Sequence, residues 1–129
     1  MFTVYQIIID EMTYRQIDVL GHKEASDRFP AYGTAQALRR GSARYTHDMR
    51  VHFTKVAEID ADNLNEVFEI GNGYGDQSKL NRLSKMHSVS VGDLIVDSKG
   101  DWYMVEPMGW SLVHNSIGYF YLPLEEVTA

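Results

Sequence analysis

The chain's densest group of residues able to bind an anion lies between Arg39 and Lys55, in the segment RRGSARYTHDMRVHFTK. It holds five Lys or Arg residues and one Asp, with aromatic and histidine side chains among them. Arginine pairs bidentately with phosphate, and aromatic rings stack on bases. The segment therefore predicts a nucleic-acid-binding patch, made of Arg39, Arg40, Arg44, Tyr45 and Arg50. A contact with a protein, or a solvated loop that balances the acidic C-terminal half, explains the same residues.

A second candidate surface is aromatic and lies toward the C-terminus. Trp102 and Met104 alternate with Tyr103 and Val105, so one pair is expected to point away from the core. Residues 118–124 (GYFYLPL) are apolar on both parities and are expected at a sheet edge, where unpaired backbone groups favour association. We therefore predict a surface that binds another protein or, in a homodimer, a second copy of the chain. It is made of Trp102, Met104, Tyr119, Phe120 and Tyr121.

Patterns for catalysis or phosphate binding are weak. The GNGYG segment, residues 71–75, follows a helix-forming stretch and contains no Gly-Lys-Ser/Thr, so it favours a helix end over a phosphate-binding loop. Ser88 and Ser90 lack a recognisable base and suit a turn. We therefore predict that the protein is not an enzyme.

Metal and cofactor sites are not expected either. None of the five histidines belongs to an H-x-x-x-H or H-E-x-x-H pattern. The acidic stretch of residues 60–69 is better explained by a helix cap and a solvated helix face than by paired catalytic carboxylates. The absence of cysteine excludes disulfides, thiol catalysis and cysteine-bound zinc.

Composition and charge indicate one soluble domain. A chain of 129 residues fits a single domain. The net charge of −6 is uneven: residues 1–55 hold eight Lys/Arg and six Asp/Glu, a net of +2, whereas residues 56–129 hold four and twelve, a net of −8. This acidity argues against general nucleic-acid affinity but leaves room for a local basic patch. The N-terminus turns acidic too early for a signal peptide or membrane span, so a cytoplasmic location is expected.

The N-terminal half contains patterns for a strand and a helix. Residues 2–9 are β-branched and aromatic on both parities, which predicts a strand covered on both faces. Residues 10–29 are non-periodic and indicate a loop or an irregular helix. Residues 31–40 contain strong helix formers between Pro30 and Gly41, which predicts a helix.

The middle of the chain predicts a second strand and a second helix. Residues 51–59 alternate in polarity, as a strand with one exposed face does. Residues 63–71 place apolar side chains on one helical face. We expect Asp60 or Asp62 to cap this helix and Gly71 to end it.

Residues 87–113 predict a three-stranded meander. The alternation changes phase at Gly92, where glycine supplies a backbone conformation that other residues resist. Gly100 is expected in the left-handed region of a hairpin turn. A further edge strand is expected to end at Pro123. The predicted fold is therefore α+β, with a mainly antiparallel sheet and about two helices on one face.

The meander and the strand–helix segment before it together resemble a known family. HSVSVGDLIV followed by DWYMVEPMGW is similar to the YodL-like segment of small phage and mobile-element proteins, and VAEIDADNLNEVFEIGN is similar to the segment before it. The resemblance covers about half of the chain, from Val56 to Val113. It implies an accessory protein of a phage or mobile element and supplies no catalytic residues.

Two functional hypotheses follow. The first is a non-enzymatic protein-binding accessory protein, with the phage or mobile-element origin that the resemblance implies, which acts on a host protein in the host cytoplasm. The alternative is a nucleic-acid-binding protein that uses Arg39–Lys55.

Overall fold

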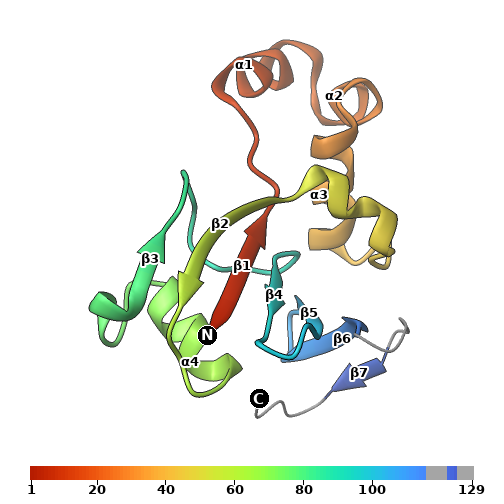
Figure 1. The fold of residues 1–129 in the computed structure, drawn as a ribbon. Coiled ribbons are helices and arrows are strands. Elements are labelled where there is room, and N and C mark those ends of the chain that lie inside the picture. Colours follow the sequence, from red (N-terminus) through yellow and green to blue (C-terminus); the bar gives the residue numbers. More distant parts are fainter. Residues whose placement is uncertain (116–121, 125–129) are drawn as a thin grey trace.

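In the described part of the chain, seven antiparallel strands form one sheet in the order β3-β2-β1-β4-β5-β6-β7 (Figure 1). The structure is a computed structural model that describes residues 1–115 and the backbone of residues 122–124. The strands are β1 (Phe2–Gln6), β2 (Thr54–Ile59), β3 (Leu80–Arg82), β4 (Leu94–Val96), β5 (Trp102–Val105), β6 (Trp110–His114) and β7 (Leu122–Leu124). The helices in this described part are α1 (Glu11–Leu20), α2 (His22–Arg28), α3 (Pro30–Arg40) and α4 (Leu64–Gly71), with short 3₁₀ helices η1 (His47–His52) and η2 (Gln77–Lys79).

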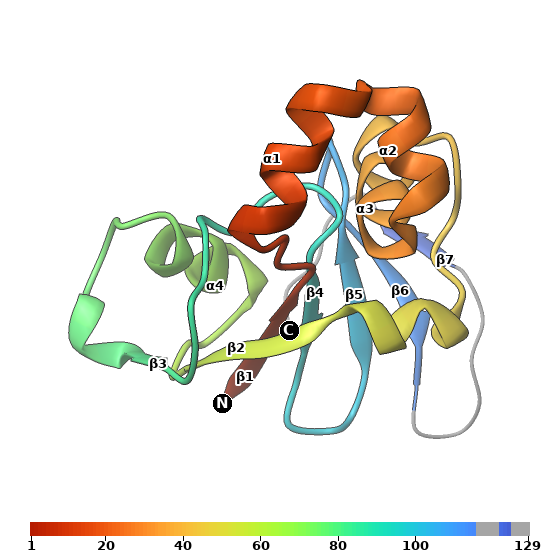
Figure 2. The same cartoon turned by 90° about the horizontal axis from the view of Figure 1, so that it is seen from above.

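Different helices cover the two faces of the sheet. Successive side chains of a strand point to opposite faces. Along β5, Tyr103 and Val105 join a buried cluster with the core residues of α4, whereas Met104 joins a second cluster with the core residues of α1, α2 and α3. Figure 2 shows α1, α2 and α3 gathered together and α4 apart from them. The sheet therefore has a hydrophobic core on each side.

The predicted α+β class and the three-stranded meander β4-β5-β6 are confirmed. Helices form at residues 31–40 and 64–71 as expected. The helices occupy both faces of the sheet instead of one, with α4 in one core and α1, α2 and α3 in the other. Among the described residues, no helix is long and apolar enough to cross a membrane.

Two helices occupy the segment expected to be a loop or irregular helix. The side chain of Asp10 caps α1 by accepting a hydrogen bond of 2.7 Å from the Thr13 N–H. Gly21, at φ 82°, separates α1 from α2. Only Ile17 of α1 is buried, so the core marks this helix at a single position.

Helix α4 begins and ends one or two residues away from the predicted positions. Its cap is Asn63, whose Oδ1 accepts a hydrogen bond of 2.9 Å from the Glu66 N–H, and neither Asp60 nor Asp62 has this role. Gly71 is the last helical residue, and Gly73, at φ 88°, has the left-handed conformation that ends the helix.

Both predicted turn glycines of the meander have positive φ. Gly92 lies at φ 92° in a turn closed by a hydrogen bond of 3.0 Å from the Asp93 N–H to the Ser90 carbonyl. Gly100 lies at φ 88° in the turn between β4 and β5. Each conformation is one that residues with a Cβ adopt only with strain.

Gly92→Val should lower the free energy of unfolding by about 1–3 kcal/mol. The φ of 92° strains any β-branched residue, and an added Cβ would lie 3.4 Å from Cγ of Arg39. Chemical denaturation measures the loss. Gly41→Val, at φ 72°, has the same backbone strain but no atom within 4 Å of an added Cβ, so it separates the strain from the contact with Arg39. Equal stability of the Gly92 variant and the wild type would show that this turn relaxes without cost.

Candidate functional site

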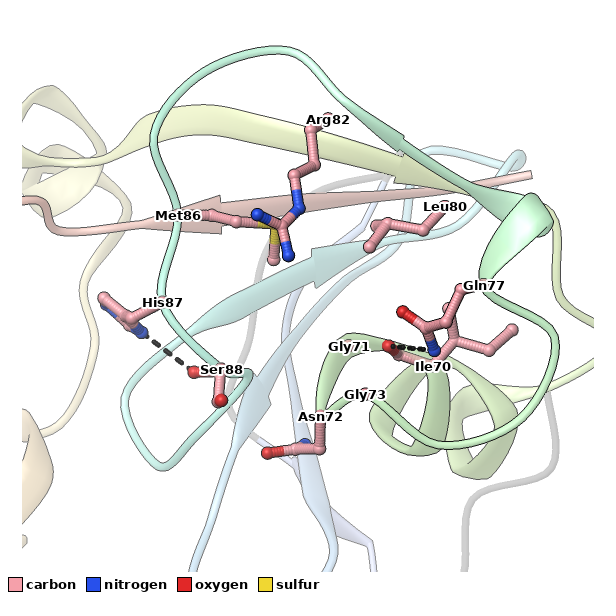
Figure 3. A pocket seen from close by; sticks show the side chains of 10 residues that line it. All are labelled: Ile70, Gly71, Asn72, Gly73, Gln77, Leu80, Arg82, Met86, His87 and Ser88. Atoms are coloured by element: carbon pink, nitrogen blue, oxygen red, sulfur yellow. Dashed lines mark hydrogen bonds between the residues drawn. The ribbon is translucent and has the colours of Figure 1, made fainter.

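A pocket of about 350 Å³ lies at the β3 edge of the sheet (Figure 3). Three segments form its wall: the end of α4 with its glycine loop, the stretch from η2 to β3, and the chain leading to the meander. The lining residues are Ile70, Gly71, Asn72, Gly73, Gln77, Leu80, Arg82, Met86, His87 and Ser88. This volume suits a small ligand or one side chain of a partner.

Among the described residues, strand β3 pairs on one side only, with β2, and is the terminal strand of the sheet. The Asp60 N–H donates to the Lys79 carbonyl at 3.0 Å, and the Leu83 N–H donates to the Val56 carbonyl at 2.8 Å. Because antiparallel hydrogen bonding alternates, the backbone of Leu80 and Arg82 between these points faces away from β2. The Leu80 N–H bonds to the Gln77 carbonyl, which leaves the Leu80 carbonyl and both backbone groups of Arg82 at the open edge.

The side chain of Arg82 reaches over the pocket, beside Met86 (Figure 3). It is exposed and has neither an ion pair nor a hydrogen bond among the described residues. Gln77 donates through Nε2 to the carbonyls of Ile70 and Tyr74, at 3.1 and 2.8 Å, so its Oε1 remains available as an acceptor. The pocket therefore offers a cationic donor fork and an amide oxygen beside apolar side chains.

The glycine loop at the pocket does not form a phosphate cradle. The Gly73 N–H donates to the Ile70 carbonyl at 3.1 Å, and the Tyr74 N–H donates to the Glu69 carbonyl at 2.9 Å. This pair of bonds is a Schellman motif, which satisfies the carbonyls at the end of a helix. The predicted helix end therefore describes this loop correctly, since these N–H groups are already bonded.

A cluster of buried polar groups holds one wall of the pocket in place. Gln6, fully buried in β1, donates through Nε2 to the His87 carbonyl at 2.9 Å and to Oδ2 of Asp93 at 3.0 Å. Its Oε1 accepts from the His87 N–H at 3.0 Å. Asp93 also accepts from the Ser90 N–H at 2.9 Å. This cluster fixes the segment that forms one wall of the pocket against the central strand.

Burial raises the pKa of Asp93 to about 6. The hydrogen bond from the Ser90 N–H, the nearby His87 ring, Gln6 and Arg39 all favour the carboxylate, but they offset the desolvation only in part. His87 Nδ1 lies 3.9 Å from Asp93 Oδ2 and 2.8 Å from the Ser88 carbonyl. Because a carbonyl only accepts, the neutral His87 ring carries its proton on Nδ1.

The raised pKa of Asp93 predicts a pH-dependent stability. Between its unfolded pKa of 3.8 and its folded pKa of about 6, the folded protein retains a proton that the unfolded chain releases. The stabilising contribution is therefore complete below pH 3.8 and is lost as the pH rises through 6, by up to about 3 kcal/mol. We expect Asp93→Asn to remove this slope, because an amide oxygen can still accept from Ser90 and Gln6. Denaturation at several pH values, with the exposed Asp62→Asn as control, measures the effect, and parallel profiles of wild type and Asp93→Asn would contradict it.

The predicted basic patch is only partly at the surface. Arg39, Arg40, Arg44 and Arg50 are exposed, as expected. Tyr45 is 6% exposed and its hydroxyl bonds to His47 Nδ1 at 2.8 Å, so it is a core residue and not a platform for base stacking. The prediction of Tyr45 as a binding residue is therefore corrected.

The structure also corrects part of the predicted aromatic surface. Met104 is 3% exposed, because both faces of the meander are covered, and it is removed from the candidate surface. Trp102 is half-buried, with its ring 4.9 Å from that of Tyr5 and 5.1 Å from that of His47. Tyr119, Phe120 and Tyr121 lie outside the described residues. Strand β7 occupies the second edge of the sheet, contains Pro123 and ends one residue after it, at Leu124.

The histidines do not gather around a common point in the described part of the chain. His47 and His114 stack with ring centroids 3.8 Å apart, and burial, His114 and Arg50 lower the pKa of His47. Within residues 1–115, no group of three His, Asp or Glu side chains is placed to hold a metal ion.

Comparisons with family models, curated proteins and solved structures return no match for this chain. The pocket brings together residues that the sequence did not single out as a site, above all Arg82 and Gln77. One sequence signal for the supporting cluster was available: Gln6 is the only strongly polar residue within the apolar run of residues 2–9.

Proposed function

We propose that this chain is a non-enzymatic protein-binding accessory protein, which binds an extended segment of its partner along the open edge of β3. The observation that carries the proposal is the outward-facing backbone of Arg82 directly beside a pocket. In strand addition, edge hydrogen bonds supply affinity and an adjoining pocket supplies side-chain specificity.

Exposed apolar side chains near this edge support the same function. Leu83 is 45% exposed immediately after β3, and Tyr74 is 71% exposed in the glycine loop. A sheet edge is usually protected by charge, proline or a covering element. Here Arg82 and Lys85 supply positive charge, which disfavours pairing with a basic segment and favours pairing with an acidic one.

Arg82→Pro tests strand addition, because it removes the outward N–H without removing a bond to β2. Proline is tolerated at an edge position whose N–H faces solvent. Random heptapeptides displayed on phage are selected on the wild-type protein, and the selected peptides are then measured against each variant. We expect Arg82→Pro to weaken binding at least tenfold, and Arg82→Gln, which keeps the N–H, to retain part of the affinity. Binding that Arg82→Pro leaves unchanged would exclude this edge.

The partner is another protein or a second copy of the chain. Sedimentation over a micromolar concentration range separates these cases, since pairing of two β3 edges produces a concentration-dependent dimer. The resemblance of Val56 to Val113 to YodL-like segments supports a phage or mobile-element origin and a host protein as target. That origin stays a prediction.

Nucleic-acid binding is the second candidate, and the four exposed arginines of the basic segment favour it. A gel shift with duplex DNA and single-stranded RNA tests it. Binding through these arginines should fall steeply between 50 and 200 mM salt, as counterion release requires, and Arg→Ala changes should weaken it about equally across sequences. Absence of a shift at low salt eliminates this candidate.

A further inference from the structure

We infer that the pocket beside β3 is a carboxylate subsite, and that the segment bound at this edge places an Asp or Glu side chain against Arg82. The inference rests on the proposed strand addition and specifies the chemistry of the partner segment.

Arg82 carries a charge with no ion-pair partner among the described residues. Two neighbouring cations are already paired, since Lys79 lies 3.6 Å from Glu66 and Lys55 lies 4.0 Å from Glu58. The exposed Lys85 is also unpaired, but it does not line the pocket. Arg82 has no such partner among the described residues, although the chain carries a net charge of −6. A guanidinium at a pocket mouth is suited to a carboxylate, which it can bind through two parallel hydrogen bonds.

The register of an added strand places one of its side chains beside Arg82. Arg82 pairs with Ala57 of β2, and Ala57 belongs to the cluster that contains α4. The side chain of Arg82 is therefore on the α4 face of the sheet, where the pocket lies. A residue that exchanges both backbone hydrogen bonds with Arg82 lies directly opposite it, and its side chain projects from the same face. That side chain therefore meets both Arg82 and the pocket.

The lining of the pocket suits an acidic side chain. Leu80, Met86 and Ile70 provide apolar contacts for the methylene groups of an acidic side chain. The Oε1 atom of Gln77 remains as an acceptor and suits an N–H of the incoming segment. A lysine opposite Arg82 would instead place two like charges together, which is unfavourable in a cross-strand pair.

The experiment uses peptides selected from the phage-displayed heptapeptide library on the full chain. Each selected peptide with a recurrent acidic residue is synthesised with that residue as Glu and as Gln. Fluorescence anisotropy measures both forms against the wild type, Arg82→Gln and Lys85→Gln. The Lys85 variant is the matched control, because it removes a nearby exposed cation that does not line the pocket.

We expect the Glu form to bind wild type and Lys85→Gln at least tenfold more tightly than the Gln form, and Arg82→Gln to bind both forms about equally. Selected peptides without an acidic preference would overturn the carboxylate inference and leave strand addition standing. An equal Glu-over-Gln preference on wild type and Arg82→Gln would also overturn it, because the carboxylate would then be recognised elsewhere. Failure to select any peptide, or selected peptides that bind Arg82→Pro as tightly as wild type, overturns the proposed function and this inference with it.

Discussion

Gln6→Leu should destabilise the fold by about 3–5 kcal/mol, although leucine has a similar size and is apolar. The Gln6 amide makes three hydrogen bonds of 2.9–3.0 Å across the core, to both backbone groups of His87 and to Asp93. Removing it leaves buried groups without partners, and each unsatisfied group costs about 1–3 kcal/mol. The raised pKa of Asp93 shows that this environment already disfavours charge, so the loss of one donor should raise that pKa further.

Urea denaturation of Gln6→Leu measures this loss, with Gln16→Leu as the matched control because Gln16 is exposed on α1. The control should change stability by less than about 0.5 kcal/mol. Hydrogen exchange provides a second readout: the His87 amide, which donates to Oε1 of Gln6, should lose protection before the amides of β5 do. A Gln6 variant as stable as the wild type would show that the buried polar cluster contributes nothing net to folding.

Turn glycines and the spacing of apolar residues explain which parts of the fold were predictable. Gly92 and Gly100 lie between apolar strands, and both have the positive φ that their position implied. The helix at residues 64–71 was predictable because its buried side chains recur at helical spacing. Helix α1 lacked that signal, since Ile17 is its only buried residue.

Residues of the candidate surfaces were harder to predict, because burial depends on contacts distant in sequence. The LIV run of β4 is apolar on both parities, and this was a signal that both faces of the meander are covered and that Met104 is buried. Tyr45 has no comparable signal: it is buried because the segment after α3 packs against the sheet. The pocket unites residues 70–73, 77–82 and 86–88, and no sequence spacing shows that these segments meet.

Close packing accounts for Gly71, which the sequence suggested as a helix end. Its φ is not positive, so its backbone conformation suits any residue. A Cβ at this position would instead lie 2.3 Å from Cγ2 and 3.1 Å from Cβ of Val89, which is 1% exposed. The glycine therefore lets the chain that leads into the meander pack directly on the end of α4, where both form the pocket wall.

Gly71→Ala should lower the free energy of unfolding by about 3 kcal/mol, since Val89 is enclosed in the core and overpacking forces side chains or backbone to shift. The gain in helix propensity, about 1 kcal/mol, is too small to offset this clash. Urea denaturation of the single variant measures the cost.

A double-mutant cycle with Val89→Ala assigns that cost to one contact. Val89→Ala alone should cost about 2 kcal/mol, because it leaves a cavity in the core. In the double variant, the Cβ of residue 71 enters the space that Cγ2 of Val89 occupied, so the combined loss should be smaller than the sum of the two single losses by at least about 1 kcal/mol. Strict additivity would show that the two positions do not contact each other as the structure places them, and the wall of the pocket would then need a different arrangement.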